Sequence, residues 1–167
     1  CLKPLFDAYD VPELKIEKNY FWALCRSIIY QQISGKAANT IANRFLELFP
    51  SGKNIKPINI IEISIDKLHS VGLSKQKASY IKNIADAFYN GEVNVENYFT
   101  MNDEEIITDL IKVKGVGKWT AEMFLLFTLR RPDIFPVTDL GVQKGFQIFY
   151  SLDEIPTIDF MNQKADK

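Results

Sequence analysis

Cysteine and histidine are scarce in this chain. Its 167 residues contain only Cys1, Cys25 and one histidine, His69. Two cysteines cannot supply a disulfide framework or the usual four thiolates of an iron–sulfur cluster. One histidine argues against a histidine-based zinc site and against a Ser-His-Asp triad. Cys25 lies in an apolar helical pattern, where a free thiol acts as a small hydrophobe, so this usage fits a reducing, intracellular environment.

Long hydrophobic runs are also absent. No apolar stretch approaches the roughly 20 residues that cross a bilayer, and we find no signal peptide. The chain opens at Cys1 rather than Met, and we therefore expect a trimmed N-terminus. The net charge of −1 neither favours nor excludes DNA as a partner. The stretch 110–147 carries six basic and three acidic side chains, which alone describes an ordinary mixed surface.

Helical periodicity dominates what is present, and no alternating run predicts a sheet. Apolar spacing predicts helices over residues 21–29, 35–49, 65–68, 78–88, 103–111, 119–129 and 139–149. Ser34 and Asn102 are expected N-caps, and Glu105 completes a capping box with Asn102. Residues 51–59 are rich in Gly, Pro and Asn, so we predict a connection there.

The segment 119–129 is apolar on nearly every side, which predicts a central buried helix. In the last predicted helix we expect Leu140, Val142, Phe146 and Phe149 to face the core. Residues after Asp153 have weak periodicity and predict a frayed tail. The chain therefore divides into a helical domain over 1–152, in two halves, and a C-terminal tail over 153–167.

The strongest local signal is residues 110–121, LIKVKGVGKWTA. A helix ends, a turn contains Gly115 and Gly117, and a second helix begins. Glycines permit positive φ and close approach of another backbone. The free N–H groups of the second helix suit a phosphate, and Lys114 and Lys118 add positive charge. We predict a DNA-binding hairpin that contacts phosphates regardless of base sequence. A weaker repeat of this pattern occurs at Leu68-x-x-x-Gly72-Leu-Ser. It is either an internal repeat or a chance similarity of two helix–turn–helix units.

These residues resemble the hairpin of helix-hairpin-helix DNA glycosylases. The loop Asp133-Ile-Phe-Pro-Val-Thr-Asp139 is similar to the loop that carries the aspartate of that superfamily. Residues 29–38, IYQQISGKAA, and 71–78, VGLSKQKA, resemble the 3-methyladenine DNA glycosylase II branch. The resemblance covers about residues 12–150. It implies an all-α fold of two packed helical halves with the active-site cleft between them.

The resemblance implies that Asp139 is the catalytic carboxylate. A fixed carboxylate beside the sugar stabilises the positive charge that develops as an N-glycosidic bond breaks, and it can activate water. The bland alternative for Asp139 is a helix N-cap, and both roles can coexist. Asp133 is a rival that fits the pattern less well. Lyase-type relatives carry a Schiff-base lysine where this chain has Trp119, which predicts a monofunctional glycosylase without strand cleavage.

Further site residues follow from the same resemblance. The pocket for a flipped base is expected to contain Trp119, Tyr30, Met123 and Phe135, although core packing is the rival interpretation for Tyr30 and Phe135. The expected DNA contacts are Gln31, Gln32, Ser34, Lys114, Gly115, Gly117, Lys118, Thr138 and Lys144, with Gln31 and Gln32 at the wedge. No cofactor is required, but a monovalent cation, Na⁺ or K⁺, is expected on the main-chain carbonyls of Ile111, Val113 and Val116.

The sequence thus predicts an alkylated-purine DNA glycosylase that acts as a monomer on double-stranded DNA inside the cell. A glycosylase/lyase for oxidised bases, a non-catalytic hairpin DNA-binding module and a protein–protein scaffold stay open as alternatives. Relatives often add an N-terminal β-rich domain and a C-terminal Trp-x-Pro-x-Arg helix, which this sequence lacks. We therefore expect either a chain that continues beyond Lys167 or a more open pocket.

Overall fold

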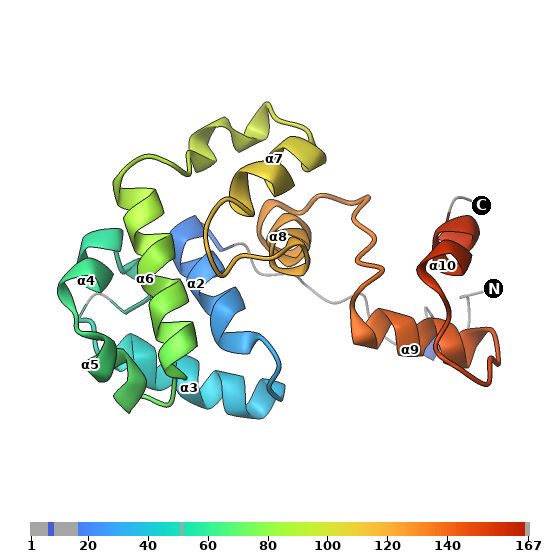
Figure 1. Ribbon diagram of the computed structural model, residues 1–167, viewed down its shortest axis with the longest axis horizontal. Coiled ribbons are helices and arrows are strands. Elements are labelled where there is room, and N and C mark those ends of the chain that lie inside the picture. The colour runs from blue at the N-terminus through green and yellow to red at the C-terminus, as the bar shows by residue number, and fades with distance from the viewer. Residues whose placement is uncertain (1–6, 9–16, 51, 166–167) are drawn as a thin grey trace.

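The computed structural model describes residues 7–8, 17–50 and 52–165, and within these ranges it contains helices and no strands (Figure 1). This confirms the all-α class. The α-helices are α2 (Tyr20–Tyr30), α3 (Gly35–Glu47), α4 (Pro57–Glu62), α5 (Ile65–Ser70), α6 (Lys75–Tyr89), α7 (Asp103–Leu110), α8 (Lys118–Phe124), α9 (Leu140–Phe149) and α10 (Ile158–Ala165). Shorter turns are η1 (Gly52–Asn54), η2 (Val95–Phe99) and the π-helical η3 (Leu125–Leu129).

The N-caps predicted at Ser34 and Asn102 are present, and Ser74 is a further cap that was not predicted. The side chains of Ser34, Ser74 and Asn102 each accept a main-chain N–H from the first turn of α3, α6 and α7. Asn102 and Glu105 form the predicted capping box. The predicted connection over residues 51–59 is wrong at its end, because α4 begins at Pro57. Proline suits the first helical position, where its missing N–H costs nothing.

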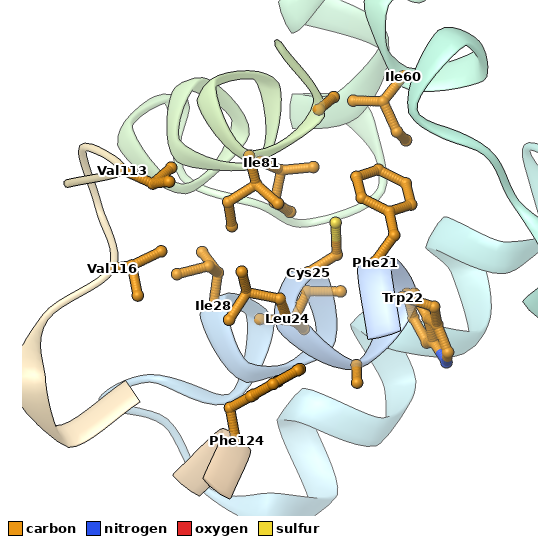
Figure 2. Close-up of a cluster of buried hydrophobic side chains, with 14 of the residues drawn as sticks. Phe21, Trp22, Leu24, Cys25, Ile28, Ile60, Ile81, Val113, Val116 and Phe124 are labelled. Atoms are coloured by element: carbon orange, nitrogen blue, oxygen red, sulfur yellow. The ribbon is translucent and has the colours of Figure 1, made fainter. Parts of the chain in front are cut away.

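The core is built around α2, which contacts α3, α6 and α8. Figure 2 shows Leu24, Cys25 and Ile28 of α2 between Ile81 of α6 and Phe124 of α8, and all five are at most 1% exposed. Burial raises the pKa of the Cys25 thiol well above its usual range. Cys25 therefore packs in the core as a small apolar side chain.

The hairpin between α7 and α8 is fixed to this core by two valines. Val113 and Val116 are 6% and 4% exposed and point towards α2 and α6 (Figure 2). The turn between them closes with a hydrogen bond of 2.9 Å from the Val116 N–H to the Val113 carbonyl. Because these side chains are buried, the Lys114 and Gly115 backbone has a fixed place on the surface.

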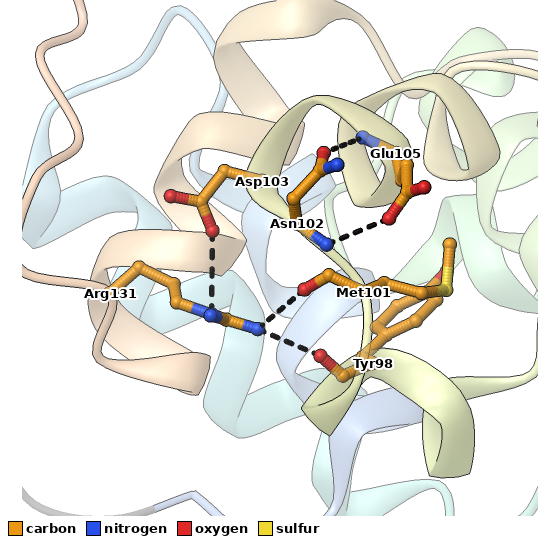
Figure 3. Close-up of polar contacts among 6 residues, drawn as sticks. All are labelled: Tyr98, Met101, Asn102, Asp103, Glu105 and Arg131. Carbon is orange, nitrogen blue, oxygen red and sulfur yellow. Dashed lines mark hydrogen bonds and ion pairs between the residues drawn. The ribbon is translucent and has the colours of Figure 1, made fainter.

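A second anchor holds the far end of the central helix. The helix closes as the π-helical turn η3, and Arg130 follows in the left-handed region with φ of 59°. Arg131 then donates to the carbonyls of Tyr98 at 2.8 Å and Met101 at 3.0 Å, and its Nε lies 3.4 Å from Asp103 Oδ1 (Figure 3). The start of the loop to residue 139 is thereby tied to the segment before α7.

Helices α9 and α10 lie to one side of the main body, after a long loop from residue 130 (Figure 1). The core-facing prediction for α9 is wrong for Leu140 and Phe149, which are 53% and 50% exposed. Phe146 is half-buried and packs against Phe135 and Tyr150 instead of the main core. Helical periodicity gives the apolar face of α9 but cannot show which core that face meets.

The expected frayed tail is also wrong. Residues 158–165 form α10, in which Met161 is fully buried and Phe160 packs edge-on against Tyr150. The division of the chain at residue 152 stays a prediction. Among the described residues, no helix combines the length and apolarity of a membrane span.

Candidate active site

The hairpin turn is shaped by one of its two glycines. Gly115 has φ of +108°, and a Cβ on it would lie 2.3 Å from Tyr80 Cγ. The side-chain amide of Asn83 donates to the Lys114 carbonyl at 3.0 Å, so α6 contacts the turn and stabilises it. Gly117 is the N-cap of α8 with φ of −92°, and a Cβ built on it would have no atom of another part of the chain within 4 Å. Gly115 is therefore needed for conformation, whereas Gly117 leaves room for another molecule's backbone.

The first three residues of α8 reach three different parts of the site, because successive helical side chains point about 100° apart. Lys118 is exposed beside the turn, and its Nζ lies 3.9 Å from Glu122 Oε1. Trp119 donates its indole N–H to Asp139 Oδ2 at 2.8 Å. Thr120 Oγ1 accepts from the Gln31 side-chain amide at 2.9 Å. One helical turn thus joins the hairpin, the carboxylate and the loop after α2.

Asp139 is held at both carboxylate oxygens. It is the N-cap of α9, and Oδ1 accepts the Val142 N–H at 2.9 Å while Oδ2 accepts the Trp119 indole. The bland N-cap prediction is therefore confirmed, and the indole bond is an addition to it. Each oxygen has a second lone-pair direction, so two acceptor sites remain for water or a ligand. Asp139 is half-buried, which leaves it accessible.

Glu122 is the buried carboxylate of α8. It is 5% exposed, and its Oε2 has no hydrogen-bond partner. Burial raises its pKa above the usual value, the charge of Lys118 lowers it, and the charge of Glu104 raises it further. It lies one turn along the helix from Trp119 and Lys118. The negative charge of Glu122 is therefore disfavoured close to the hairpin, where a phosphate would bind.

The loop after α2 places its predicted residues in different roles. Gln31 is turned inwards, since its amide also reaches the Gly115 carbonyl at 3.5 Å. Gln32 is exposed and takes a left-handed conformation with φ of 55°. Ser34 is exposed, and its hydroxyl caps α3 by accepting the Ala37 N–H. Of the two predicted wedge residues, only Gln32 has its side chain outside.

The remaining predicted residues are more scattered. Tyr30 bonds to Asn39 of α3 and lies under the Arg26 guanidinium, 5.2 Å from ring centroid to Cζ. Phe135 packs on Phe146 with 5.5 Å between ring centroids. Of the other predicted residues, Met123 is half-buried, and Thr138 and Lys144 are exposed.

Sequence reasoning missed several groups that position the site: Lys77, Tyr80, Asn83, Thr120 and Arg131. Lys77 could have been found. It stands four residues before Ile81 and seven before Ile84, so it shares the buried face of α6. A charged residue on a buried face demands a partner. Asn83 and Arg131 bind main-chain carbonyls far away in sequence, for which no local pattern exists.

No cluster of three or more His, Cys, Asp or Glu side chains within the described ranges could hold a metal ion. The main-chain carbonyls of the hairpin are the other potential ligands. The carbonyl of Val113 accepts one hydrogen bond and keeps a second lone pair.

Known proteins share this sequence and fold. Residues 25–167 match the family described as HhH-GPD superfamily base excision DNA repair protein. The chain is 34% identical over 142 residues to DNA-3-methyladenine glycosylase 1 of Schizosaccharomyces pombe, covering 84% of this chain and 62% of that protein. It is 38% identical over 146 residues to the DNA-3-methyladenine glycosylase of Saccharomyces cerevisiae, covering 80% of this chain and 48% of that one.

Among solved structures, the S. pombe 3-methyladenine DNA glycosylase in complex with abasic DNA superposes with a TM-score of 0.90 at 31% identity. The alignment covers 99% of this chain and 80% of that one. The 3-methyladenine glycosidase of Bacillus halodurans gives a TM-score of 0.76 at 33% identity, over 89% and 68% of the two chains. Against the two yeast relatives, this chain spans about half to three fifths of their length.

Proposed function

Because this chain belongs to the HhH-GPD superfamily of base excision DNA repair proteins, we propose that it is a monofunctional DNA glycosylase for alkylated purines. It hydrolyses the N-glycosidic bond of the damaged base in double-stranded DNA. The observation that carries the proposal is the bond from Trp119 to Asp139, 2.8 Å long. It ties a half-buried carboxylate directly to the helix that begins at the hairpin.

The relatives support the choice of substrate class. Those with the cited identities are named 3-methyladenine DNA glycosylases, and the S. pombe structure contains abasic DNA. Abasic DNA is what remains after a base has been released by hydrolysis. The enzyme's substrate would place it inside the cell, and a monomer is expected to suffice.

The chemistry follows from how Asp139 is held. Its two donors fix the carboxylate, so little reorganisation is needed when positive charge develops on the sugar. At about 4 Å and an effective dielectric near 20, that attraction is on the order of 4 kcal/mol. Such a stabilisation of the transition state is about a thousandfold in rate. The free lone pairs of Asp139 can also orient the attacking water.

The lyase alternative needs a lysine beside the sugar. Trp119 occupies the position of the family's Schiff-base lysine, and its N–H is already bonded to Asp139. The neighbouring Lys118 points towards Glu122, 3.9 Å away, on another side of α8. We therefore expect hydrolysis alone, leaving an abasic site with the strand intact.

DNA is held at the hairpin in this proposal. Gly117 leaves space for a phosphate at the start of α8, and Lys114, Lys118 and Lys144 are exposed for charge contacts. From the resemblance we expect the main-chain carbonyls of Ile111, Val113 and Val116 to hold a Na⁺ or K⁺ ion there, which would add positive charge towards a phosphate. Residues carried over only by resemblance are the exposed Ser34 and Thr138 as DNA contacts, and Tyr30, Met123 and Phe135 as pocket walls. Affinity should fall as salt rises.

The test is base release from methylated duplex DNA by wild type, Asp139→Asn and the control Asp133→Asn. Asp133 is an exposed carboxylate of the same loop. We expect methylpurine release by wild type and by the control but not by Asp139→Asn, with strand breaks only after alkali. A borohydride-trapped adduct would mean a lyase instead. If the wild type binds DNA but releases nothing, the chain is a binding module.

A further inference from the structure

The end of α2 is held by a lysine from another helix. The last four carbonyls of a helix lack partners inside it, and the last turn of α2 has no basic residue. Lys77 of α6 fills this need: its Nζ donates to the Ile29 carbonyl at 2.8 Å and to the Gln31 carbonyl at 2.7 Å. Its positive charge also suits the negative end of the helix dipole.

The same residue, Gln31, is held from a second side. Its side-chain amide donates to Thr120 Oγ1 at 2.9 Å, and Thr120 is 1% exposed in α8. Gln31 is therefore fixed by α6 through its main chain and by α8 through its side chain. This bond comes from the same turn of α8 that carries Trp119.

The next two residues form an exposed tip. Gln32 is exposed with φ of 55°, and Ile33 is 38% exposed. Ser34 ends the tip as the N-cap of α3. A left-handed conformation costs a residue with a side chain about 1–2 kcal/mol. Such a conformation persists only where the surroundings determine it, and here both ends of the tip are held.

We propose that Lys77 and Thr120 are positioning residues that hold the Gln32–Ile33 tip ready to enter the base stack. This inference rests on the proposed function, which requires the damaged base to leave the duplex. Flipping a base costs a few kcal/mol of stacking and pairing. A tip already in its bound conformation loses little further entropy on insertion, so more of its contact energy opposes that cost.

The chain offers a matched control for Lys77. Lys82, five residues further along α6, donates its Nζ to the Ile61 carbonyl at 2.8 Å near the end of α4. Lys82→Met removes a contact of the same kind at another helix end, away from the tip. Lys77→Arg keeps the charge and the donors, and Thr120→Val removes only the side-chain contact to Gln31.

The experiment places 2-aminopurine opposite a methylpurine in duplex DNA and follows its fluorescence on binding, which reports unstacking. Single-turnover base release, affinity for undamaged duplex and melting temperature are measured on the same proteins. We expect Lys77→Met to lose most of the fluorescence rise and about tenfold or more in release, as expected for loss of a charged hydrogen bond. Its affinity for undamaged DNA should stay within about twofold, because the hairpin phosphate contacts remain.

The controls distinguish a role of Lys77 in positioning the tip from a role in the stability of the fold alone. Lys82→Met should lower the melting temperature as Lys77→Met does, yet keep the fluorescence rise and the release rate. Lys77→Arg should recover both signals, and Thr120→Val should lose part of them. If Lys77→Met and Lys82→Met behave alike in fluorescence and release, or Thr120→Val is unaffected, the proposal is overturned. If the wild type releases no base, the proposed function itself fails.

Discussion

Gly115 should be the least replaceable residue of the hairpin. An alanine there would keep φ near +108°, which costs about 1–2 kcal/mol for a residue with a Cβ. Its Cβ would also lie 2.3 Å from Tyr80 Cγ and 2.6 Å from Tyr80 Cβ, so the ring must shift. Overpacking of this kind costs about 1–3 kcal/mol. Together these predict a loss of about 2–5 kcal/mol in the free energy of unfolding.

Gly117→Ala is the matched comparison two residues away. Gly117 has φ of −92° and no atom within 4 Å of a built Cβ, so we expect a change within about 0.5 kcal/mol. For a chain of this length, 1 kcal/mol shifts the melting temperature by about 2–4 °C. Thermal unfolding should therefore show a fall of about 4–20 °C for Gly115→Ala and almost none for Gly117→Ala.

A double-mutant cycle isolates the contact with Tyr80. In a Tyr80→Ala background the close contacts with the ring are absent, whereas the 2.6 Å contact with Cβ and the φ strain remain. Gly115→Ala should therefore cost less than in wild type by part of the overpacking penalty, about 1–2 kcal/mol. Gly117→Ala should lower affinity for duplex DNA without loss of stability, because the added methyl fills the space left for a phosphate. Equal melting temperatures for the two alanine variants, or an unchanged cost of Gly115→Ala in the Tyr80→Ala background, would refute this reasoning.

Three further substitutions test other parts of the account. Trp119→Phe keeps an aromatic ring but removes the donor to Asp139 Oδ2. The single-turnover rate of base release should fall about 10–100-fold, while the affinity for abasic DNA stays the same. An unchanged rate would contradict a role of this hydrogen bond in base release. Burial raises the pKa of Glu122, so its protonated form stabilises the fold fully below about pH 4.5, and this stabilisation is lost as pH rises through the pKa in the folded protein. The melting temperature of Glu122→Gln minus that of wild type should therefore rise from pH 4.5 to pH 7.5. A difference that does not change with pH would contradict this. Arg131→Met leaves two carbonyls without their donor and should lower the free energy of unfolding by about 2–3 kcal/mol. Lys112→Met removes only the surface ion pair with Asp109 and should lower it by at most about 1 kcal/mol. Equal melting temperatures for the two variants would contradict the stabilising role of Arg131.

The sequence predicted the elements whose signals are local. The caps Ser34 and Asn102 and the all-α class are each encoded within a few residues, and each is confirmed. The central buried helix predicted over residues 119–129 is confirmed as far as Leu125, but Phe127 in the π-helical turn is 50% exposed. The N-cap role of Asp139 was local in the same way. Local patterns were enough because capping groups and helical spacing act over one or two turns.

What the sequence could not show are contacts between distant segments. The indole bond to Asp139 spans 20 positions, and the contact of Lys77 with Gln31 spans 46. Helix α9 has an apolar face, yet Leu140 and Phe149 are half exposed because α9 lies beside the main body. Helix α10 was not predicted because its apolar contacts, such as that of Phe160 with Tyr150, lie outside the helix itself.

Asp139→Asn needs a control for its own structural effect. Asparagine is as good an N-cap as aspartate, so α9 should keep its start. However, if the side-chain oxygen of this asparagine accepts the Val142 N–H, its NH₂ group faces the indole N–H of Trp119. Two hydrogen-bond donors then face each other. Pairing Asp139→Asn with Trp119→Phe removes this conflict. Asp139→Asn alone should therefore melt below wild type, whereas the double variant should melt close to Trp119→Phe.

The most direct test of the central claim is the single-turnover rate of methylpurine release by Asp139→Asn, measured alongside its affinity for abasic DNA. We expect a fall of about 100–1,000-fold in rate, because the charge facing the sugar is removed, and an affinity within about threefold of wild type, because the phosphate contacts of the hairpin remain. A rate within tenfold of wild type would contradict the assignment of Asp139 as the catalytic carboxylate.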